Sequence, residues 1–212
     1  MPFGRQLLPS VGNALLLFVE KGRLHDMKNH SHGFTLIEML VVVTIVAILS
    51  ALALPSFNTM MQKRSAQGAA LALISDFRLA RSEAVRRSIG VSVCALAVNS
   101  TSACSGAPAN WANGWMVFVD PSDSGTRGTH DAGEEVIRVQ QPYSGIATIQ
   151  QATTPSNTRP YIPYDASGWS KAATETFVVT PSGTPSADAI RTVCVSLQGR
   201  VRILPQGAIQ CS

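Results

Sequence analysis

The sequence lacks the residue constellations on which most enzymes depend. It contains no Gly-x-Ser-x-Gly elbow that would position a nucleophile. His130 stands beside Asp131, but no candidate nucleophile accompanies this pair. We therefore expect neither an enzymatic activity nor a cofactor.

Cysteine is scarce, and its spacing argues against a metal site. There is no Cys-x-x-Cys pair, and none of the 4 histidines lies near a cysteine in the sequence, so a structural zinc site is disfavoured. The 4 cysteines allow three disulfide connectivities, of which we favour the two local bonds. These bonds need an oxidising compartment, and each would stabilise the fold by roughly 3 kcal/mol in the chain-entropy model. The expected pairs are Cys94–Cys104 and Cys194–Cys211.

Charge is also sparse, and one long segment has almost none. Between Phe34 and Leu54 the only charged residue is Glu38. A helix needs roughly 20 apolar residues to cross the hydrocarbon core of a bilayer, so residues 34–54 are predicted to span a membrane. A lone carboxylate at that depth costs a few kcal/mol unless it finds a partner.

The residues at the start of this segment narrow the interpretation. The stretch 33–40, Gly-Phe-Thr-Leu-Ile-Glu-Met-Leu, resembles the signal of a type IV prepilin. The resemblance implies that prepilin peptidase cuts between Gly33 and Phe34, and that the new Phe34 amine is methylated. It also implies that Glu38 pairs with the N-terminal amine of a neighbouring pilin during assembly. An ordinary signal anchor with an incidental Glu38 is the alternative.

The resemblance further implies where the chain resides and how it is processed. It would be a single-pass inner-membrane prepilin with a periplasmic C-terminal domain, later carried into a pilus on the cell surface. Residues 1–33 would form the leader. Because Met27 to Gly33 alone makes a typical leader, we expect translation to start at Met27 and residues 1–26 not to be translated; a long leader is the alternative. Trimming reduces the formal net charge of +4, so net charge alone does not indicate nucleic acid.

Beyond the membrane segment the periodicity changes twice. In residues 55–88, small and apolar side chains recur at alternating steps of four and three, which is one face of a helix. They are Ala66, Ala70, Leu73, Phe77, Ala80 and Ala84. After Gly90, strands are predicted at 91–98, 115–119, 136–139, 146–150, 176–180, 190–197 and 201–204. Surface loops are predicted between them, notably at 121–133 and 153–170.

These elements predict an α+β fold. One long helix from Phe34 to about Ser88 would pack on an antiparallel β-sheet domain over residues 89–212. Within that domain, residues 114–120, 131–138 and 177–183 resemble the GspH/FimT branch of pilin-like proteins. This branch contains GspH-type pseudopilins of type II secretion and FimT-type minor pilins, some of which bind DNA during natural transformation.

The C-terminal loop favours the FimT type. It is similar to the Gly-Arg-x-Arg motif of DNA-binding FimT proteins, matched at Gly199, Arg200 and Arg202. The chemistry agrees independently, because residues 189–212 contain three arginines and no acidic residue. Side chains two apart on a strand share one side, and a glycine permits the turn that presents them. Guanidinium groups grip phosphates without reading base sequence. We therefore predict a non-specific DNA site of Gly199, Arg200, Arg202, Arg191 and Gln198.

Other interpretations stay open at this stage. The arginines could be the solvated side of a last strand, or the protein could be a GspH-like pseudopilin. It could also be a minor pilin that primes pilus assembly, with the arginines meeting other pilins. The loop Asp120–Asp131 partly matches a calcium loop, although a solvated loop is favoured. Trp111, Trp115 and Trp169 could stack on bases of single-stranded DNA, although core positions are favoured.

Overall fold

The structure is a computed structural model that describes residues 33–106, 110–121, 127–152, 159–170 and 174–205, together with residues 208 and 211. Side chains of residues 52–55 lie outside this description, as does the predicted leader apart from Gly33. The chain divides into two compact units, Met1–Ile45 and Val46–Ser212. We describe each unit by itself.

Helix α1 runs from Leu36 to Arg87, as the sequence predicts to within two residues. The backbone N–H of Glu38 donates to the hydroxyl of Thr35 at 3.2 Å, which is an N-terminal cap for the helix. The described side chains up to Ala51 are exposed, and the helix is long and apolar enough to cross a membrane. Exposed apolar side chains over this length suit a lipid or protein environment better than water.

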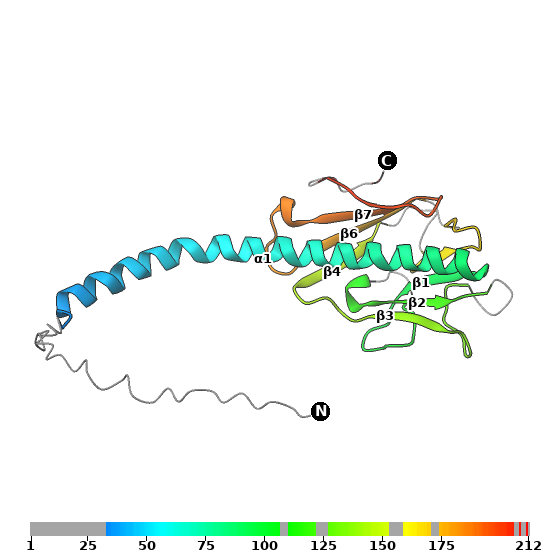
Figure 1. Ribbon diagram of the computed structural model, residues 1–212, viewed down its shortest axis with the longest axis horizontal. Helices are drawn as coiled ribbons and strands as arrows, with labels where there is room; N and C mark the ends of the chain where they lie inside the picture. Colours follow the sequence, from blue (N-terminus) through cyan, green and yellow to red (C-terminus); the bar gives the residue numbers. More distant parts are fainter. Residues whose placement is uncertain are drawn as a thin grey trace, which may run out of the picture. The chain divides into compact units, whose positions relative to one another are not determined.

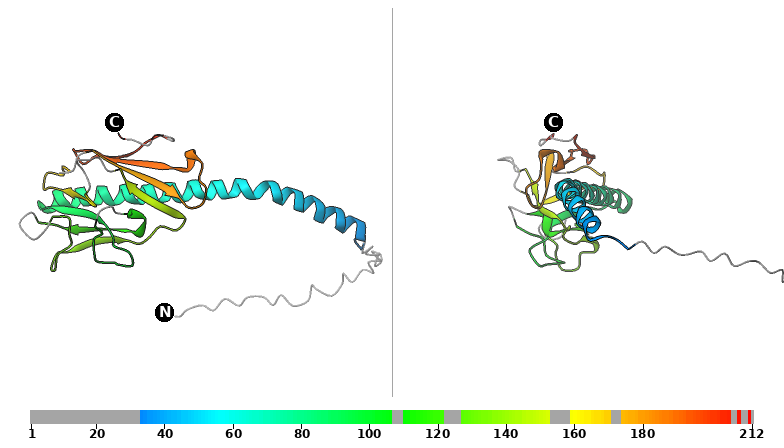
Figure 2. Two further views of the ribbon diagram at one scale, coloured as in Figure 1. Left: turned by 180° about the vertical axis from the view of Figure 1, so that it is seen from behind. Right: turned by 90° about the vertical axis from the view of Figure 1, so that its left-hand side faces the viewer.

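The second half of α1 carries the packing face. All six residues of the predicted stripe are completely buried, which confirms the periodicity argument. Most of them are alanine, and small side chains let sheet residues approach the helix axis closely. Figures 1 and 2 show this half of the helix lying along the strands, with β6 and β7 to one side and β1 to β3 to the other.

The strands form two antiparallel four-stranded sheets rather than one. The first has the order β3-β2-β1-β5 and the second β4-β6-β7-β8. The first consists of β1 (Val91–Ala95), β2 (Trp115–Val119), β3 (Val136–Gln140) and β5 (Tyr161–Tyr164). The second consists of β4 (Ile146–Gln151), β6 (Glu175–Pro181), β7 (Arg191–Val195) and β8 (Val201–Ile203). Two short 3-10 helices, η1 (Trp111–Asn113) and η2 (Ala187–Ala189), complete the described elements.

Strand β5 corrects the sequence prediction, which placed residues 153–170 in a surface loop. It pairs with β1, and its Pro163 lies opposite Ser92. A proline argues against a strand because it cannot donate to a ladder, but it is tolerated at an edge. β5 is the edge of its sheet, so the missing donor costs nothing there.

The core lies between α1 and both sheets. Phe77, Trp111 and Phe177 meet at its centre, with ring centroids 5.0–6.0 Å apart. A smaller apolar cluster on the far face of the first sheet contains Leu96, Met116 and Phe118. Strands β1, β2 and β7 are buried along their whole length. All buried residues of the described chain lie between Ala66 and Val201, so a fragment of residues 58–212 retains the whole core.

Candidate functional site

Gly199 and Arg200 of the predicted Gly-Arg-x-Arg segment lie in the turn between β7 and β8, and Arg202 lies in β8 itself. Gly199 N donates to Ser196 O at 2.8 Å, and Ser196 N donates to Arg200 O at 2.9 Å. The hydroxyl of Ser196 also accepts from Arg200 N at 3.2 Å. These bonds fix the backbone of the turn. Arg200 and Arg202 are both exposed.

Arg200 and Arg202 line one shallow hollow of about 300 Å³, which we call the turn hollow. Its other lining residues are Thr174, Cys194, Ser196 and Gln198. The prediction that the two arginines share a side is consistent with this geometry. Arg202 pairs with Cys194 in the ladder, and Cys194 faces away from α1 because its neighbours Val193 and Val195 belong to the core on that side. None of the described residues that line the hollow is acidic.

Two contacts hold the turn in position. Gly199 adopts a positive φ of 71°, and a Cβ at this residue would lie 2.3 Å from the carbonyl oxygen of Gly168. Only glycine fits such an approach. The disulfide Cys194–Cys211 ties the end of the chain to β7. The structure also contains the disulfide Cys94–Cys104. Both local bonds favoured by the sequence are therefore present.

Arg191 does not join this site, which corrects the sequence prediction. It is 8% exposed, and its Nε donates to Gln67 of α1 at 2.9 Å. Its Nη1 donates to the carbonyl oxygens of Asp188 and Ile190. Arg191 shares the side of β7 that Val193 and Val195 turn to the core, so the alternation of the strand predicts this placement. It links strand and helix and is not available to a phosphate.

The three tryptophans have different environments. Trp111 and Trp115 are buried in the core, and Trp115 Nε1 donates to Asp76 at 2.8 Å. Trp169 is 47% exposed. It follows Gly168, whose carbonyl approaches Gly199, and Ser170 N donates to Leu197 O at 3.0 Å. Of the three, only Trp169 lies near the turn with an accessible ring.

Glu175 is a buried acid on the opposite side of the second sheet from the turn hollow. It is 1% exposed, and its Oε2 accepts from Gln151 Nε2 at 2.7 Å. Its Oε1 has no hydrogen-bond partner among the described residues. Burial raises the pKa of this carboxyl, while Gln151 and the charge of Arg159 act in the other direction.

The raised pKa of Glu175 predicts a pH-dependent stability difference. The folded chain keeps the proton at pH values where the unfolded chain has lost it, so this group stabilises the fold at low pH. That contribution decreases as the pH rises from the ordinary value of 4.5 through the raised one. We expect Glu175→Gln, which resembles the protonated form, to unfold at a higher denaturant concentration than the wild type at pH 7. The difference should disappear near pH 4, and an equal or larger gain at pH 4 would contradict it.

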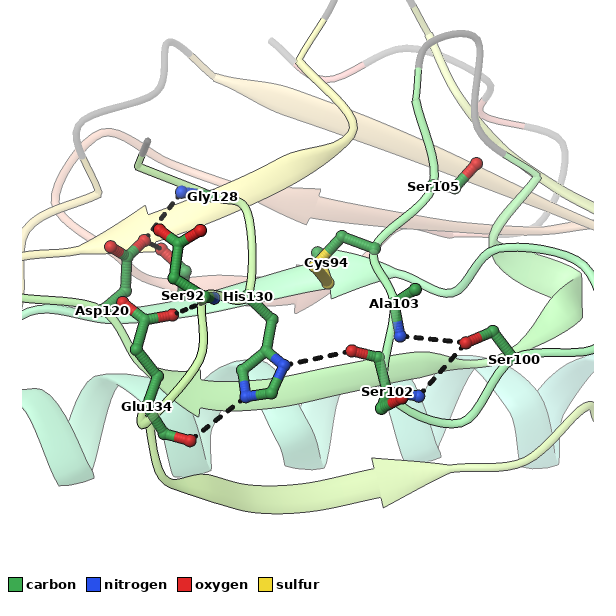
Figure 3. The surroundings of a disulfide bond; sticks show 12 residues. Ser92, Cys94, Ser100, Ser102, Ala103, Ser105, Asp120, Gly128, His130 and Glu134 are labelled. Carbon is green, nitrogen blue, oxygen red and sulfur yellow. Dashed lines mark hydrogen bonds between the residues drawn. A yellow bond between two sulfur atoms is a disulfide. The ribbon is translucent and has the colours of Figure 1, made fainter. Parts of the chain in front are cut away.

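Asp120 and His130 both form hydrogen bonds or close polar contacts within the fold. Asp120 Oδ2 accepts from Ser92 and, at 2.8 Å, from Gly128 N. The ring nitrogens of His130 lie 3.1 Å from the carbonyl oxygens of Ser102 and Glu134, beside the Cys94–Cys104 disulfide (Figure 3). His130 therefore connects two loops and does not face a nucleophile. Residues 122–126 of the loop that partly matches a calcium loop lie outside the described residues.

No group of three or more histidine, cysteine, aspartate or glutamate side chains in the described ranges could hold a metal ion. Asp120, the first candidate ligand of the calcium loop, is 2% exposed and already accepts two internal hydrogen bonds. Both of these hydrogen bonds go to Oδ2, and Oδ1 of Asp120 has no hydrogen-bond partner among the described residues.

The chain matches the family model "Type II transport protein GspH" over residues 69–199 and the prokaryotic N-terminal methylation motif over residues 28–54. No curated protein matches the chain in sequence.

Solved structures similar to the chain include two crystal forms of the type IV minor pilin FimU of Pseudomonas aeruginosa. One is 20% identical with a TM-score of 0.51, covering 72% of this chain and 98% of FimU. The other is 22% identical with a TM-score of 0.48, covering 69% and 98%. The minor pseudopilin EpsH of the Vibrio cholerae type 2 secretion system is 13% identical with a TM-score of 0.41, covering 66% and 96%. The FimU match at 0.51 supports the fold alone. Because the family model spans more than half of the sequence, the protein belongs to the GspH family of type IV pilin-like proteins.

Proposed function

We propose that this protein is a FimT-like minor pilin that binds DNA without sequence preference during natural transformation. The observation that carries the proposal is the turn hollow, which is lined both by Arg200 on the hydrogen-bonded turn and by Arg202 on β8. The described lining contributes no carboxylate that would repel a phosphate. Membership of a family of filament components supports a binding role over an enzymatic one.

The chemistry of the hollow suits a phosphodiester backbone. Each guanidinium presents a planar pair of donors that matches two phosphate oxygens. The amide of Gln198 and the hydroxyls of Ser196 and Thr174 offer neutral hydrogen bonds around the same hollow. Such contacts supply affinity and position without sequence information. Retraction of the filament would then carry the bound DNA inward.

The N-terminal segment supports a processed, membrane-anchored precursor. The methylation motif covers residues 28–54. Residues 34–51 are largely apolar, and their side chains are exposed. We propose cleavage by prepilin peptidase after Gly33, methylation of Phe34, and pairing of Glu38 with the amine of a neighbouring pilin. Mass spectrometry of the mature protein should show a chain that starts at N-methylated Phe34. A mature chain that retains residues before Phe34 would contradict this part of the proposal.

The binding proposal is tested by titrating random-sequence duplex DNA with the full chain in nonionic detergent micelles. We expect micromolar or weaker affinity that falls steeply between roughly 50 and 200 mM salt, because each neutralised phosphate releases counterions. Residues 1–33 carry basic side chains of their own, at Arg5, Lys21, Arg23 and Lys28. A variant that keeps these residues but lacks Arg200 and Arg202 therefore measures the DNA binding that does not depend on the turn hollow.

A structural pseudopilin of type II secretion is the second candidate. The observation that favours it is the extent of the family match, which ends at residue 199 and so omits Arg200 and Arg202. Under this alternative the arginines would contact neighbouring subunits. Absence of DNA binding at the lower salt concentration would favour the pseudopilin and remove the DNA-uptake proposal.

A further inference from the structure

A second hollow lies on the helix side of the same turn. It has a volume of about 750 Å³ and lies between α1 and the backbone of Gly199 to Val201. We call it the helix groove. Its α1 side is lined by Arg78, Arg81, Val85 and Arg86, among others. Arg78, Arg81 and Val85 follow steps of three and four, and Arg86 lies four residues beyond Ser82, which also lines the groove, so these residues share one face of the helix.

The arginines of the helix groove differ in whether they are already paired with an acidic side chain or a carbonyl oxygen. Arg86 is bound by Glu83 through two hydrogen bonds, of 3.1 and 2.5 Å. Arg78 is exposed and forms no ion pair with a described residue. Arg81 donates from Nε to the carbonyl oxygen of Gly168 at 3.0 Å, and its two Nη groups form no ion pair with a described residue. No acidic side chain lines the described part of the groove.

Arg200 connects the two hollows, because it is the one described residue that lines both. The positive surface therefore continues from Arg202 across Arg200 to Arg81 and Arg78. Val85 is 49% exposed in the groove and offers an apolar surface for the carbon atoms of a sugar. Guanidinium groups beside an apolar floor suit a sugar–phosphate chain better than a free inorganic anion.

Resting on the proposed function, we propose that the DNA backbone continues from the turn hollow into the helix groove, where Arg78 and Arg81 contact further phosphates. An anionic membrane is the competing partner for a basic helix face. Arg78 lies 24 residues beyond Leu54 on α1, which is about 36 Å at 1.5 Å per residue. Because Arg78 lies this far along the helix from the predicted membrane segment, a polymeric anion that also contacts Arg200 is favoured over the membrane surface.

The experiment compares Arg78→Gln with Arg64→Gln in the full chain in nonionic detergent, using the same duplex titration. Both arginines are exposed on α1, and Arg64 lies outside the groove, so the two variants lose the same charge. We expect Arg78→Gln to weaken binding roughly three- to tenfold near 0.1 M salt and to reduce the slope of log K against log salt by about one. Arg64→Gln should stay within about twofold of the wild type, because long-range charge effects are screened.

The outcomes separate this proposal from the one it rests on. If the wild type binds DNA and Arg78→Gln behaves like Arg64→Gln, the DNA does not enter the helix groove, while the turn hollow remains the site. If the wild type does not bind, both proposals fail. Binding of residues 58–212 to phosphatidylserine vesicles that is lost in Arg78→Gln, with unchanged DNA affinity, would assign the groove to lipid and overturn the inference.

Discussion

Replacing both Arg200 and Arg202 by alanine should remove almost all DNA binding by the turn hollow. Each guanidinium is expected to neutralise about one phosphate, and losing one such contact lowers affinity on the order of tenfold near 0.1 M salt. The double variant should therefore bind roughly a hundredfold more weakly, and its salt slope should fall by about two. Gel-shift titration of the full chain at two salt concentrations measures both quantities.

The fold should survive this change. Both arginines are exposed, Arg202 lies on the edge strand β8, and surface substitutions usually shift stability by about 0.5 kcal/mol or less. Lys63→Ala/Arg64→Ala is the control that removes the same formal charge from α1, where Arg64 is exposed and Lys63 is partly exposed and paired with Asp188. Arg200→Lys/Arg202→Lys should keep most of the salt slope and lose part of the affinity, because lysine lacks the planar pair of donors. Equal binding by the double alanine variant and the control would remove the turn hollow from the mechanism.

Phe77→Ala should be among the most destabilising single substitutions in the chain. Phe77 is completely buried, and its ring centroid lies 5.1 Å from that of Phe177 and 6.0 Å from that of Trp111. Truncating a buried phenylalanine costs about 3–5 kcal/mol because it loses transfer energy and leaves a cavity. Urea unfolding of residues 58–212, followed by circular dichroism, should show this loss in the free energy of unfolding.

The control for Phe77 lies on the opposite side of the same helix. Leu71 is 52% exposed, so Leu71→Ala should change the free energy of unfolding by about 0.5 kcal/mol or less in this fragment. Phe177 belongs to the second sheet, and Trp111 lies in η1 just before β2 of the first sheet. The substitution therefore tests whether one aromatic cluster holds helix and sheets together. A loss below about 1 kcal/mol would show that the cavity collapses and that the cluster is not the centre of the core.

The sequence predicts those parts of the fold that depend on the spacing of residues close together in the chain. The stripe from Ala66 to Ala84 repeats at helical spacing, and packing on a sheet requires such a face, so helix and burial follow together. The disulfides follow from short cysteine spacing. Strand β5 was missed because Pro163 is unfavourable within a strand, and its tolerance depends on β5 being an edge. Sequence alone does not state which strands are edges.

In the candidate site, too, some features follow from local sequence and others depend on contacts between distant segments. Gly199, Arg200 and Arg202 are recognisable together because they lie in one short motif, and the alternation of a strand places both arginines on one side. That same alternation places Arg191 with Val193, but only packing against Gln67 of α1 shows that this side is closed. Arg78 and Arg200 are far apart in sequence and meet because the β7–β8 turn packs on α1. Sequence therefore determined the long helix with its apolar first half, the fold class and the motif, since each depends on neighbouring residues. Only the tertiary structure decided which arginines face solvent together, because that depends on contacts between distant segments.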